Sequence, residues 1–490
     1  MARKGDPIRN VRLDDEEFFR IRKEEVLCQW ETGKELENFD ECVAAARECS
    51  AGKNYADKQL DARKNGYHII MPQFGQGLTE FVIEGMSYVE ANSPLLPHGV
   101  WNIYSDSYTR KLNFKMAQVG IERSKAEGRT MLNGWPIVCL GVEEARKIKQ
   151  AIRAPITLNS TDEDGRLASE IALAAGWNAC NCRSLQEVYA HCKHIPLDEE
   201  IRINQYECRL AAKYTEAGVP MAPHIASNLT GYDMPGFKAL VMTAQTLIGA
   251  EQGIKQFFFE QGLNMHLIED AATIAVTEKL AKEYLERFGY SDIETSSGAF
   301  PYLGAWPPRN EEADAMIAWN TVDTLLAGFD TAILKCRDEA FATPTKESMA
   351  SAVRIARHLD MLIGKQRIDA TGDEYQLEEQ MIELEVRSIL EKCLEIADGD
   401  IVVALCKGVE AGWIDNMLTP WEFNHGKVRL MRDSEKAHRY WNTGDLPVPQ
   451  EVKDYHLKRL EGRASVEGRP LDFNMLVSDL QYASRIAPQV

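Results

Sequence analysis

The sequence is poor in the features that mark membrane, secreted and nucleic-acid-binding proteins. No apolar run approaches the roughly 18 residues that a membrane-spanning helix requires. The start, "MARKGDPIRNVRLDDEEFF", lacks the apolar segment of a signal peptide. Positive charge is scarce, since 56 Lys and Arg face 75 Asp and Glu, a formal net charge of −19. Because such a surface repels phosphate, we expect no nucleic-acid partner. Since the chain shows neither a signal segment nor an apolar span, we expect a cytoplasmic protein without membrane partners.

Several standard site motifs are absent as well. The sequence has no G-x-x-x-x-G-K-[ST], no H-E-x-x-H and no G-x-S-x-G. The stretch "PQFGQGLTE" is only a loose version of the Gly-rich turn of dinucleotide-binding sheets, which disfavours an open doubly wound fold. The 11 cysteines are an odd number, and without a secretory start we expect reduced thiols.

The chain does contain short β-like runs, and these alternate with amphipathic helical stretches. Apolar residues make up 44% of it, enough for a large core. This alternation predicts an α/β protein with a parallel sheet, and we favour a (β/α)₈ TIM barrel. Nine strand candidates compete for eight places, so one must be wrong, and the two closest together are 135–140 and 154–159. The candidates are 67–72, 100–105, 135–140, 154–159, 177–182, 219–225, 254–260, 293–300 and 331–336.

Three parts of the chain are predicted. Residues 1–66 form an N-terminal helical extension, and its stretch "LDDEEFFRIRKEEVLCQW" has acidic residues in the first turn of a helix. Residues 67–372 form the barrel. Residues 373–490 form a long helix, over 373–399, and a mixed α+β extension.

The polar residues that follow the predicted strands are the candidates for chemistry, because barrel sites lie at the carboxyl ends of the strands. Lys335 and Glu339 follow the last strand, although a rim salt bridge would explain them equally well. Arg110, in "SDSYTR", could hold a carboxylate with two parallel hydrogen bonds, or be an ordinary surface arginine. Other strand-end candidates are Gln73, Asn133, Asn159 and the group from Asn181 to His191.

One cluster of Cys and His raises the possibility of a metal site. "CNCRSLQEVYAHCKH" contains Cys180, Cys182, His191, Cys192 and His194, and thiolates and imidazoles are zinc ligands. Their spacing matches no standard zinc motif. A metal-dependent barrel lyase that uses this cluster stays open as an alternative, beside buried structural thiols.

The motifs together identify a resemblance. The chain resembles the large catalytic epsilon subunit of adenosylcobalamin-dependent glutamate mutase, or methylaspartate mutase, from about residue 14 to 485. The stretches that carry it are "DEEFFRIRKEEVLCQWETGKE", "SYTR", "EGRTMLNGWP", "RLASEIALAAGW", "LTG" at 229–231, "AEQG" at 250–253, "PTKE" at 344–347, "GDIVVALCKGVEAGWID" and "EGRPLDFNM".

This resemblance implies a fold, a reaction and partners. The family fold is a (β/α)₈ barrel and the family reaction is a radical carbon-skeleton rearrangement that uses adenosylcobalamin. Lys335 and Glu339 match residues that contact the adenosyl ribose, and Leu303 is a further cofactor-binding candidate. The cobalt ligand is expected from a small partner subunit with D-x-H-x-x-G, because "DYHLKR" here lacks the glycine and this chain would hold no metal itself. A homodimer of large subunits within a heterotetramer is implied.

The substrate pocket departs from the family pattern. Of three arginines that hold glutamate in the family, only Arg110 is present here, and the other two positions carry Gln73 and Asn159. The remaining altered pocket positions are Asn181 for a glutamate, Glu187 and His191 for tyrosines, and Ala226 for a phenylalanine. A carboxylate without a partner in a dry pocket is costly. We therefore predict an amino-acid substrate with one carboxylate held by Arg110 and a neutral or cationic group in place of the second.

Two further alternatives remain open. Glutamate itself would be the substrate if protonated His191 or Lys193 restored the missing charge. The chain could also be a non-catalytic binding subunit, although a degenerate site has no reason to keep Lys335 and Glu339.

Overall fold

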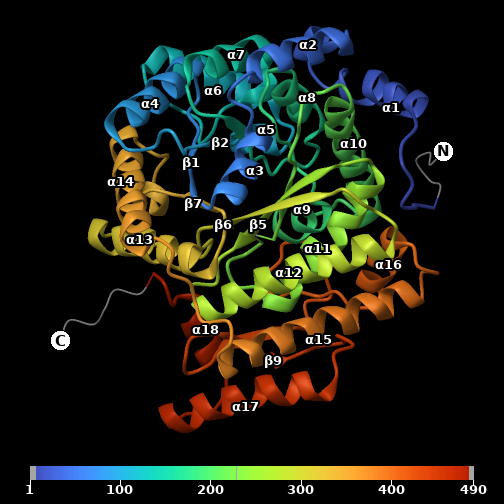
Figure 1. Ribbon diagram of the computed structural model, residues 1–490, viewed down its shortest axis with the longest axis vertical. Coiled ribbons are helices and arrows are strands. Elements are labelled where there is room, and N and C mark those ends of the chain that lie inside the picture. The colour runs from blue at the N-terminus through green and yellow to red at the C-terminus, as the bar shows by residue number, and fades with distance from the viewer. Residues whose placement is uncertain (1–6, 228, 485–490) are drawn as a thin grey trace.

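The computed structural model describes residues 7–227 and 229–484 (Figure 1). Its first helices begin at polar caps: Asp14 and Asn54, for example, each accept a hydrogen bond from the backbone three residues on. Phe18 is buried and stacks on Tyr206, with 5.0 Å between the ring centroids. The elements before the first strand are α1 (Asp15–Ile21), the π-helical η1 (Arg22–Val26), the 3₁₀ turn η2 (Glu31–Leu36), α2 (Phe39–Ser50) and α3 (Tyr55–Asn65).

A curled parallel sheet forms the centre of the molecule. Its order is β3-β2-β1-β7-β6-β5-β4, and within the described residues it contains seven strands, all paired in parallel. The strands are β1 (Ile69–Phe74), β2 (Trp101–Ile103), β3 (Ile156–Leu158), β4 (His224–Ala226), β5 (Gln256–Gly262), β6 (Glu294–Phe300) and β7 (Thr331–Leu334).

An extended segment around residues 178–182 takes the eighth place. It runs parallel to β4 through an isolated bridge between Asn181 and His224. The Cys182 amide donates to the His224 carbonyl at 2.8 Å, and the Asn181 side chain donates to the Ser160 carbonyl after β3. The chain is therefore an α/β protein with the predicted (β/α)₈ barrel, one of whose strands is reduced to a bridge.

Helices surround the sheet, as the parallel order requires (Figure 1). None of the described helices is long and apolar enough to cross a lipid bilayer. The helices from the first strand to the end of the barrel are α4 (Thr79–Asn92), α5 (Ser107–Arg110), α6 (Phe114–Glu127), α7 (Ile137–Ala151), α8 (Arg166–Ala174), α9 (Ser184–Ala190), α10 (Leu197–Glu216), α11 (Pro235–Glu251), α12 (Leu267–Arg287), α13 (Asn310–Ala327), the 3₁₀ turn η3 (Arg337–Ala340) and α14 (Lys346–Ile363).

The barrel interior is packed with apolar side chains and closed from one end by α3. Met71, Phe258 and Ile333 come from three different strands and share one buried cluster with Tyr55 of α3. The Tyr55 ring stacks on His224 of β4, with 5.6 Å between centroids. Since α3 leads directly into β1, it covers the amino ends of the strands and leaves the carboxyl ends open.

The part of the chain that follows the barrel forms the mixed extension that the sequence predicts. The long helix α15 (Asp373–Glu395) packs against α11 and α12, and an antiparallel pair of strands lies beyond it (Figure 1). The other elements are α16 (Ile401–Glu410), β8 (Arg429–Arg432), β9 (His438–Asn442), α17 (Gln450–Glu467) and α18 (Phe473–Leu480). The division of the chain at residues 66/67 and 372/373 into separate domains stays a prediction.

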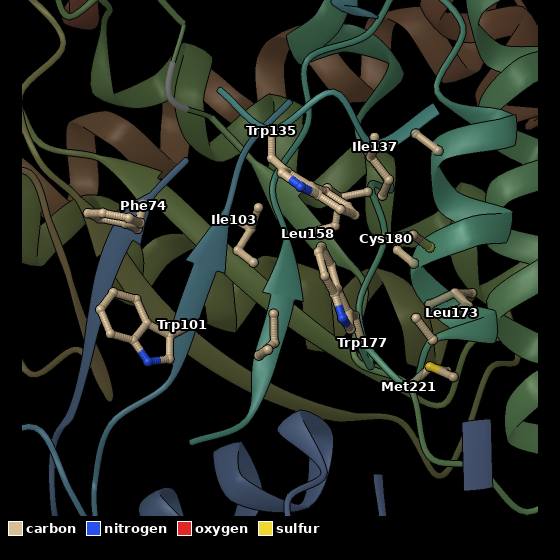
Figure 2. Close-up of a cluster of buried hydrophobic side chains, with 14 of the residues drawn as sticks. Phe74, Trp101, Ile103, Trp135, Ile137, Leu158, Leu173, Trp177, Cys180 and Met221 are labelled. Carbon is tan, nitrogen blue, oxygen red and sulfur yellow. The ribbon is translucent and has the colours of Figure 1, made fainter. Parts of the chain in front are cut away.

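One predicted strand is wrong. Residues 135–140 do not form a strand, because α7 begins at Ile137 directly after Pro136. The run "IVCL" instead buries one side of this helix, and a short apolar run fits a buried helix as well as a strand. Trp135 and Ile137 point into the apolar cluster between β1–β3 and α8, where Trp135 meets Trp177 at 5.4 Å between centroids (Figure 2).

Candidate active site

A cavity of about 630 Å³ opens at the carboxyl ends of the barrel strands. This volume lies within the roughly 300–1,000 Å³ that is usual for small-molecule sites. All predicted site residues line the cavity except Asn181, Glu187 and Ala226. The lining residues are Gln73, Tyr104, Arg110, Asn133, Asn159, Thr161, His191, Leu229, Thr230, Phe300, Leu303, Lys335, Glu339, Phe341, Ala342, Thr343 and Pro344.

Lys335 and Glu339 form an ion pair on one wall of this cavity. Lys335 is the first residue after β7, and the 3₁₀ turn that follows brings Glu339 back beside it. The Lys335 side chain is 10% exposed and lies 5.6 Å above the centroid of the Phe300 ring, while Glu339 is 35% exposed. An ammonium group and a carboxylate that meet at a cavity wall can donate to and accept from the hydroxyl groups of a bound ligand.

Asp338, between these two residues, holds the loop in place. Its carboxylate accepts hydrogen bonds from the Thr345 amide at 2.8 Å and from the Ser348 hydroxyl at 3.0 Å, at the start of α14. The charged residues that follow β7 therefore have two different roles. Asp338 anchors the turn, and the Lys335–Glu339 pair faces the cavity.

Arg110 lines the cavity after β2, two places from β7 in the sheet, and has no carboxylate partner in the described part of the chain. It ends the short helix α5, whose first turn is capped by the buried Asp106. Its Nη1 atom is 3.5 Å from the Thr161 hydroxyl, and its buried Nε atom has no hydrogen-bond partner. No ion pair within the described residues involves Arg110, so its guanidinium is available for an anionic ligand.

Gln73 and Asn133 add neutral polar groups to the lining of the cavity. Gln73 is on β1, level with Asn102 of β2. The Asn133 side-chain oxygen accepts a hydrogen bond from the Ser107 amide at 2.9 Å, which fixes the orientation of its amide. Both side chains can donate to or accept from a ligand, but neither carries charge.

Asn159 is linked to a buried network behind the cavity wall. Its Nδ2 atom donates to both carboxylate oxygens of Glu260, at 3.0 Å each, and its Oδ1 atom accepts from Arg183 at 2.9 Å. Glu260 is fully buried, and its Oε2 atom is 2.7 Å from Nδ1 of His224. Burial alone would raise the pKa of Glu260, but the hydrogen bond and charge of His224, with Arg183 and Asn159, lower it below its ordinary value.

Asn181 and Glu187 lie behind the wall rather than in the cavity. Both residues are 4% exposed. Oε1 of Glu187 is 2.9 Å from Nε of Arg183, although the two groups are not aligned as a hydrogen bond. Burial raises the pKa of Glu187 to about 8 against the opposing charge of Arg183, so this carboxyl group is mostly protonated at neutral pH.

His191 lines the cavity in its neutral form. Burial, together with the charges of Arg183, Arg110 and Lys111, lowers its pKa to about 3. Protonated His191 therefore does not replace a missing arginine. Lys193, the other candidate for that task, is exposed and does not line the cavity.

The Cys and His residues that suggested a metal site are not brought together. Cys180 and Cys182 are in the apolar core, and the Cys182 sulfur lies 2.8 Å from that of Cys208. The His194 ring is exposed and 3.1 Å from the Glu422 carboxylate. Residues 7–227 and 229–484 contain no cluster of three His, Cys, Asp or Glu side chains arranged to hold a metal ion, and the geometry gives the metal-dependent lyase no support.

Several site residues escaped prediction. Leu303 was expected in the cavity, but Tyr104, Thr161, Phe300 and Phe341 were not. Tyr104 directly follows β2, and Thr161 is the third residue after β3, so the strand-end rule could have found both. Arg183 lies within the predicted group from Asn181 to His191, but its contact with Asn159 could not be predicted, because the two residues are 24 positions apart.

Fold and cavity together define a (β/α)₈-barrel protein whose polar cavity lies where proteins of this fold bind their substrates. Residues 50–486 match the family described as "Methylaspartate mutase E chain (MutE)", and the chain belongs to that family. It is 31% identical to the glutamate mutase epsilon subunit of Desulfitobacterium hafniense over 96% of each chain, and 31% identical to that of Yersinia enterocolitica over 97% of each. The protein of that name from Haloarcula marismortui is 30% identical over 96% of this chain and 94% of its own.

Proposed function

We propose that this chain is the catalytic subunit of an adenosylcobalamin-dependent carbon-skeleton mutase whose substrate carries one carboxylate, bound by Arg110, and is not glutamate. The observation that carries the proposal is the division of charge in the cavity. One wall holds the self-compensated Lys335–Glu339 pair, and the other holds Arg110 as its only permanent cation among the described lining residues. The family relationship supports the class of reaction.

The residues present fit the nucleoside part of adenosylcobalamin. A ribose offers hydroxyl groups that can donate to the Glu339 carboxylate and accept from the Lys335 ammonium. Leu303 and Phe300 supply apolar surface beside this pair. When bound, the cofactor would supply the hydrogen-abstracting radical by homolysis of its cobalt–carbon bond.

The cobalt ligand is expected from a second polypeptide. The nearest approach to D-x-H-x-x-G in this chain is at Asp454–Arg459, and it lacks the glycine. His456 of that stretch is 2% exposed within α17, where it stacks edge-on with Tyr440. Since this imidazole cannot reach a large cofactor outside the barrel, we propose a small cobalamin-binding partner with the complete motif, and a heterotetramer that contains two copies of this chain.

The residues of the substrate wall would bind and orient the substrate. Arg110 holds the carboxylate with two of its donors, and Gln73, Asn133 and Asn159 surround the remaining polar group with neutral amides. Charge-assisted hydrogen bonds contribute about 1.5–3 kcal/mol, so a second carboxylate that lacks such a partner binds much more weakly. A reactive radical also requires that water be excluded, and the barrel provides a closed floor of apolar side chains.

A second candidate, conversion of glutamate itself, has one observation in its favour. Arg183 lies one layer behind the wall, 2.9 Å from the Asn159 side-chain oxygen, and could supply positive charge. Measured turnover of each substrate distinguishes glutamate from an amino acid with one carboxylate. The chain is combined with adenosylcobalamin and a small cobalamin-binding protein that has the D-x-H-x-x-G motif, and L-glutamate is compared with amino acids that have one carboxylate. We expect little methylaspartate from glutamate, and its efficient formation would contradict the altered specificity.

A further inference from the structure

The Asn159 amide is held between two buried ionic groups of opposite sign. Glu260, at the end of β5, accepts from Nδ2 through both of its oxygens at 3.0 Å, and Arg183 donates to Oδ1 at 2.9 Å. Both ionic side chains are completely buried, whereas Asn159 lines the cavity. The two ionic groups therefore reach a ligand only through Asn159, one from each end of its amide.

Each ionic group also has partners that fix its place. The Arg183 guanidinium donates to the Ser160 carbonyl and lies 2.9 Å from Glu187. Glu260 contacts His224, whose other ring nitrogen is 2.9 Å from the Thr157 hydroxyl. Within the described residues, no nitrogen–oxygen distance of 4.0 Å or less joins Arg183 directly to Glu260. Asn159 thus bridges the two charges.

Four groups at this bridge bear on its net charge: Glu260, Arg183, Glu187 and His224. The pKa of Glu260 is lowered, so it is ionised at neutral pH, and Arg183 is permanently charged. Glu187 also faces Arg183, but burial raises its pKa to about 8, which leaves it mostly uncharged at neutral pH. Glu260 is a counter-charge of Arg183 across the Asn159 amide, and His224 is the group that faces Glu260 from the other side.

We propose that Glu260 and Arg183 are specificity-determining residues, which hold the Asn159 amide in one orientation and cancel each other's charge behind it. This inference rests on the proposed function and deepens it: the second polar group of the substrate is an uncharged one, such as a carboxamide or a hydroxyl. A carboxylate at this wall would find the positive charge of Arg183 already compensated, and an ammonium group would find the same for Glu260.

The proposal predicts that two substitutions change the charge behind Asn159 in opposite directions. Glu260→Gln keeps the shape and one acceptor but removes one negative charge from behind Asn159, so the wall becomes more positive. Arg183→Gln removes one positive charge from behind Asn159, so the wall becomes more negative. At the short separations involved, a change of one charge in a poorly solvated site is expected to shift the preference between charged and neutral ligands by roughly tenfold.

The test uses L-glutamine and L-glutamate as probes, because they differ in charge at one end and hardly in shape. Calorimetric titration of the full chain at pH 7 gives a Kd for each. We expect the unmodified chain to bind glutamine about ten times more tightly than glutamate. Glu260→Gln should reduce this ratio to about one, and Arg183→Gln should increase it to roughly a hundred. A purely structural role would weaken both probes equally in both variants.

A remote ion pair provides the matched control. Arg22 and Glu170 are as deeply buried and 2.9 Å apart, but they do not line the cavity. Glu170→Gln should lower thermal stability without changing the glutamine-to-glutamate ratio. If one of the two wall variants fails to fold, as judged by circular dichroism, the sign of the shift in the other still decides.

The outcomes separate this inference from the function on which it rests. An unchanged ratio, or shifts of the same sign in both wall variants, overturns the role of Glu260 and Arg183 and leaves the mutase proposal standing. Failure of Arg110→Ala to weaken either probe, or a lack of binding of both probes by the unmodified chain, overturns the proposed substrate site and this inference with it.

Discussion

The two walls of the cavity differ in whether their charged side chains are paired. The β7 side carries Lys335 and Glu339 in contact with each other, partly exposed and within one short turn of chain. Arg110, after β2, has no ion-pair partner among the described residues, while Arg183 and Glu260 are buried one layer deeper, behind Asn159 at the end of β3, and are separated by it.

This difference assigns each wall a kind of ligand. A pair that is already neutral interacts with a ligand through hydrogen bonds and suits a polyhydroxyl group such as a ribose. An arginine without a counter-ion attracts an anion, and there is one such arginine among the described lining residues. Nucleoside binding is therefore expected to depend on hydrogen-bond geometry, and substrate binding on charge.

The largest expected effect concerns the buried layer behind the substrate wall. Because the pKa of Glu187 is raised to about 8 from an ordinary 4.5, the unfolded chain releases this proton at lower pH than the folded chain does. Its contribution to stability is therefore lost as pH rises from 4.5 to 8, by ~1.4 kcal/mol per pH unit at most. Glu187→Gln should remove this slope, seen in urea unfolding at pH 5 and pH 8. The exposed Glu422→Gln serves as the control, and an equal pH dependence in all three proteins would refute the shift.

Arg110→Ala comes next in size. Loss of charge-assisted hydrogen bonds worth about 1.5–3 kcal/mol should weaken binding of L-glutamine by roughly 10- to 150-fold, with Arg110→Lys between the two. Arg123→Ala, on the solvent face of α6, should change nothing. Calorimetry measures all three, and normal binding by Arg110→Ala would show that the carboxylate lies elsewhere.

On the other wall, Glu339→Gln should weaken 5′-deoxyadenosine by about tenfold while it leaves glutamine binding unchanged, because one charge-assisted hydrogen bond to the nucleoside is replaced by a neutral one. Asp314→Asn offers a neighbouring control, since Asp314 pairs with Arg337 2.6 Å away and is outside the cavity. Equal losses of both ligands on titration of Glu339→Gln would mean that the two walls do not act separately.

The contacts on the two walls could not be predicted equally well from the sequence. The β7 side was predictable because Lys335 and Glu339 are four residues apart, so one local turn suffices to bring them together. On the other side, Asn159 meets Arg183 across 24 residues and Glu260 across 101, and no local pattern encodes those contacts. The strand alternation predicted the barrel, but it could not tell the buried helix start after Trp135 from a strand, because both are short and apolar.

The smallest effect is expected at Lys193, and it tests whether the substrate wall has a hidden second cation. Lys193 is exposed and beyond the cavity lining, so Lys193→Ala should change the affinity for L-glutamate and L-glutamine by less than about twofold, as surface substitutions usually do. His191 does not offer that charge either, because its pKa of about 3 keeps the ring neutral. A selective loss of glutamate binding in Lys193→Ala, measured by calorimetry beside Lys111→Ala, would mean that the side chain folds over the cavity when a dicarboxylate arrives. The contrast between a wall with one cation and a wall with a neutral pair would then hold only for the empty site.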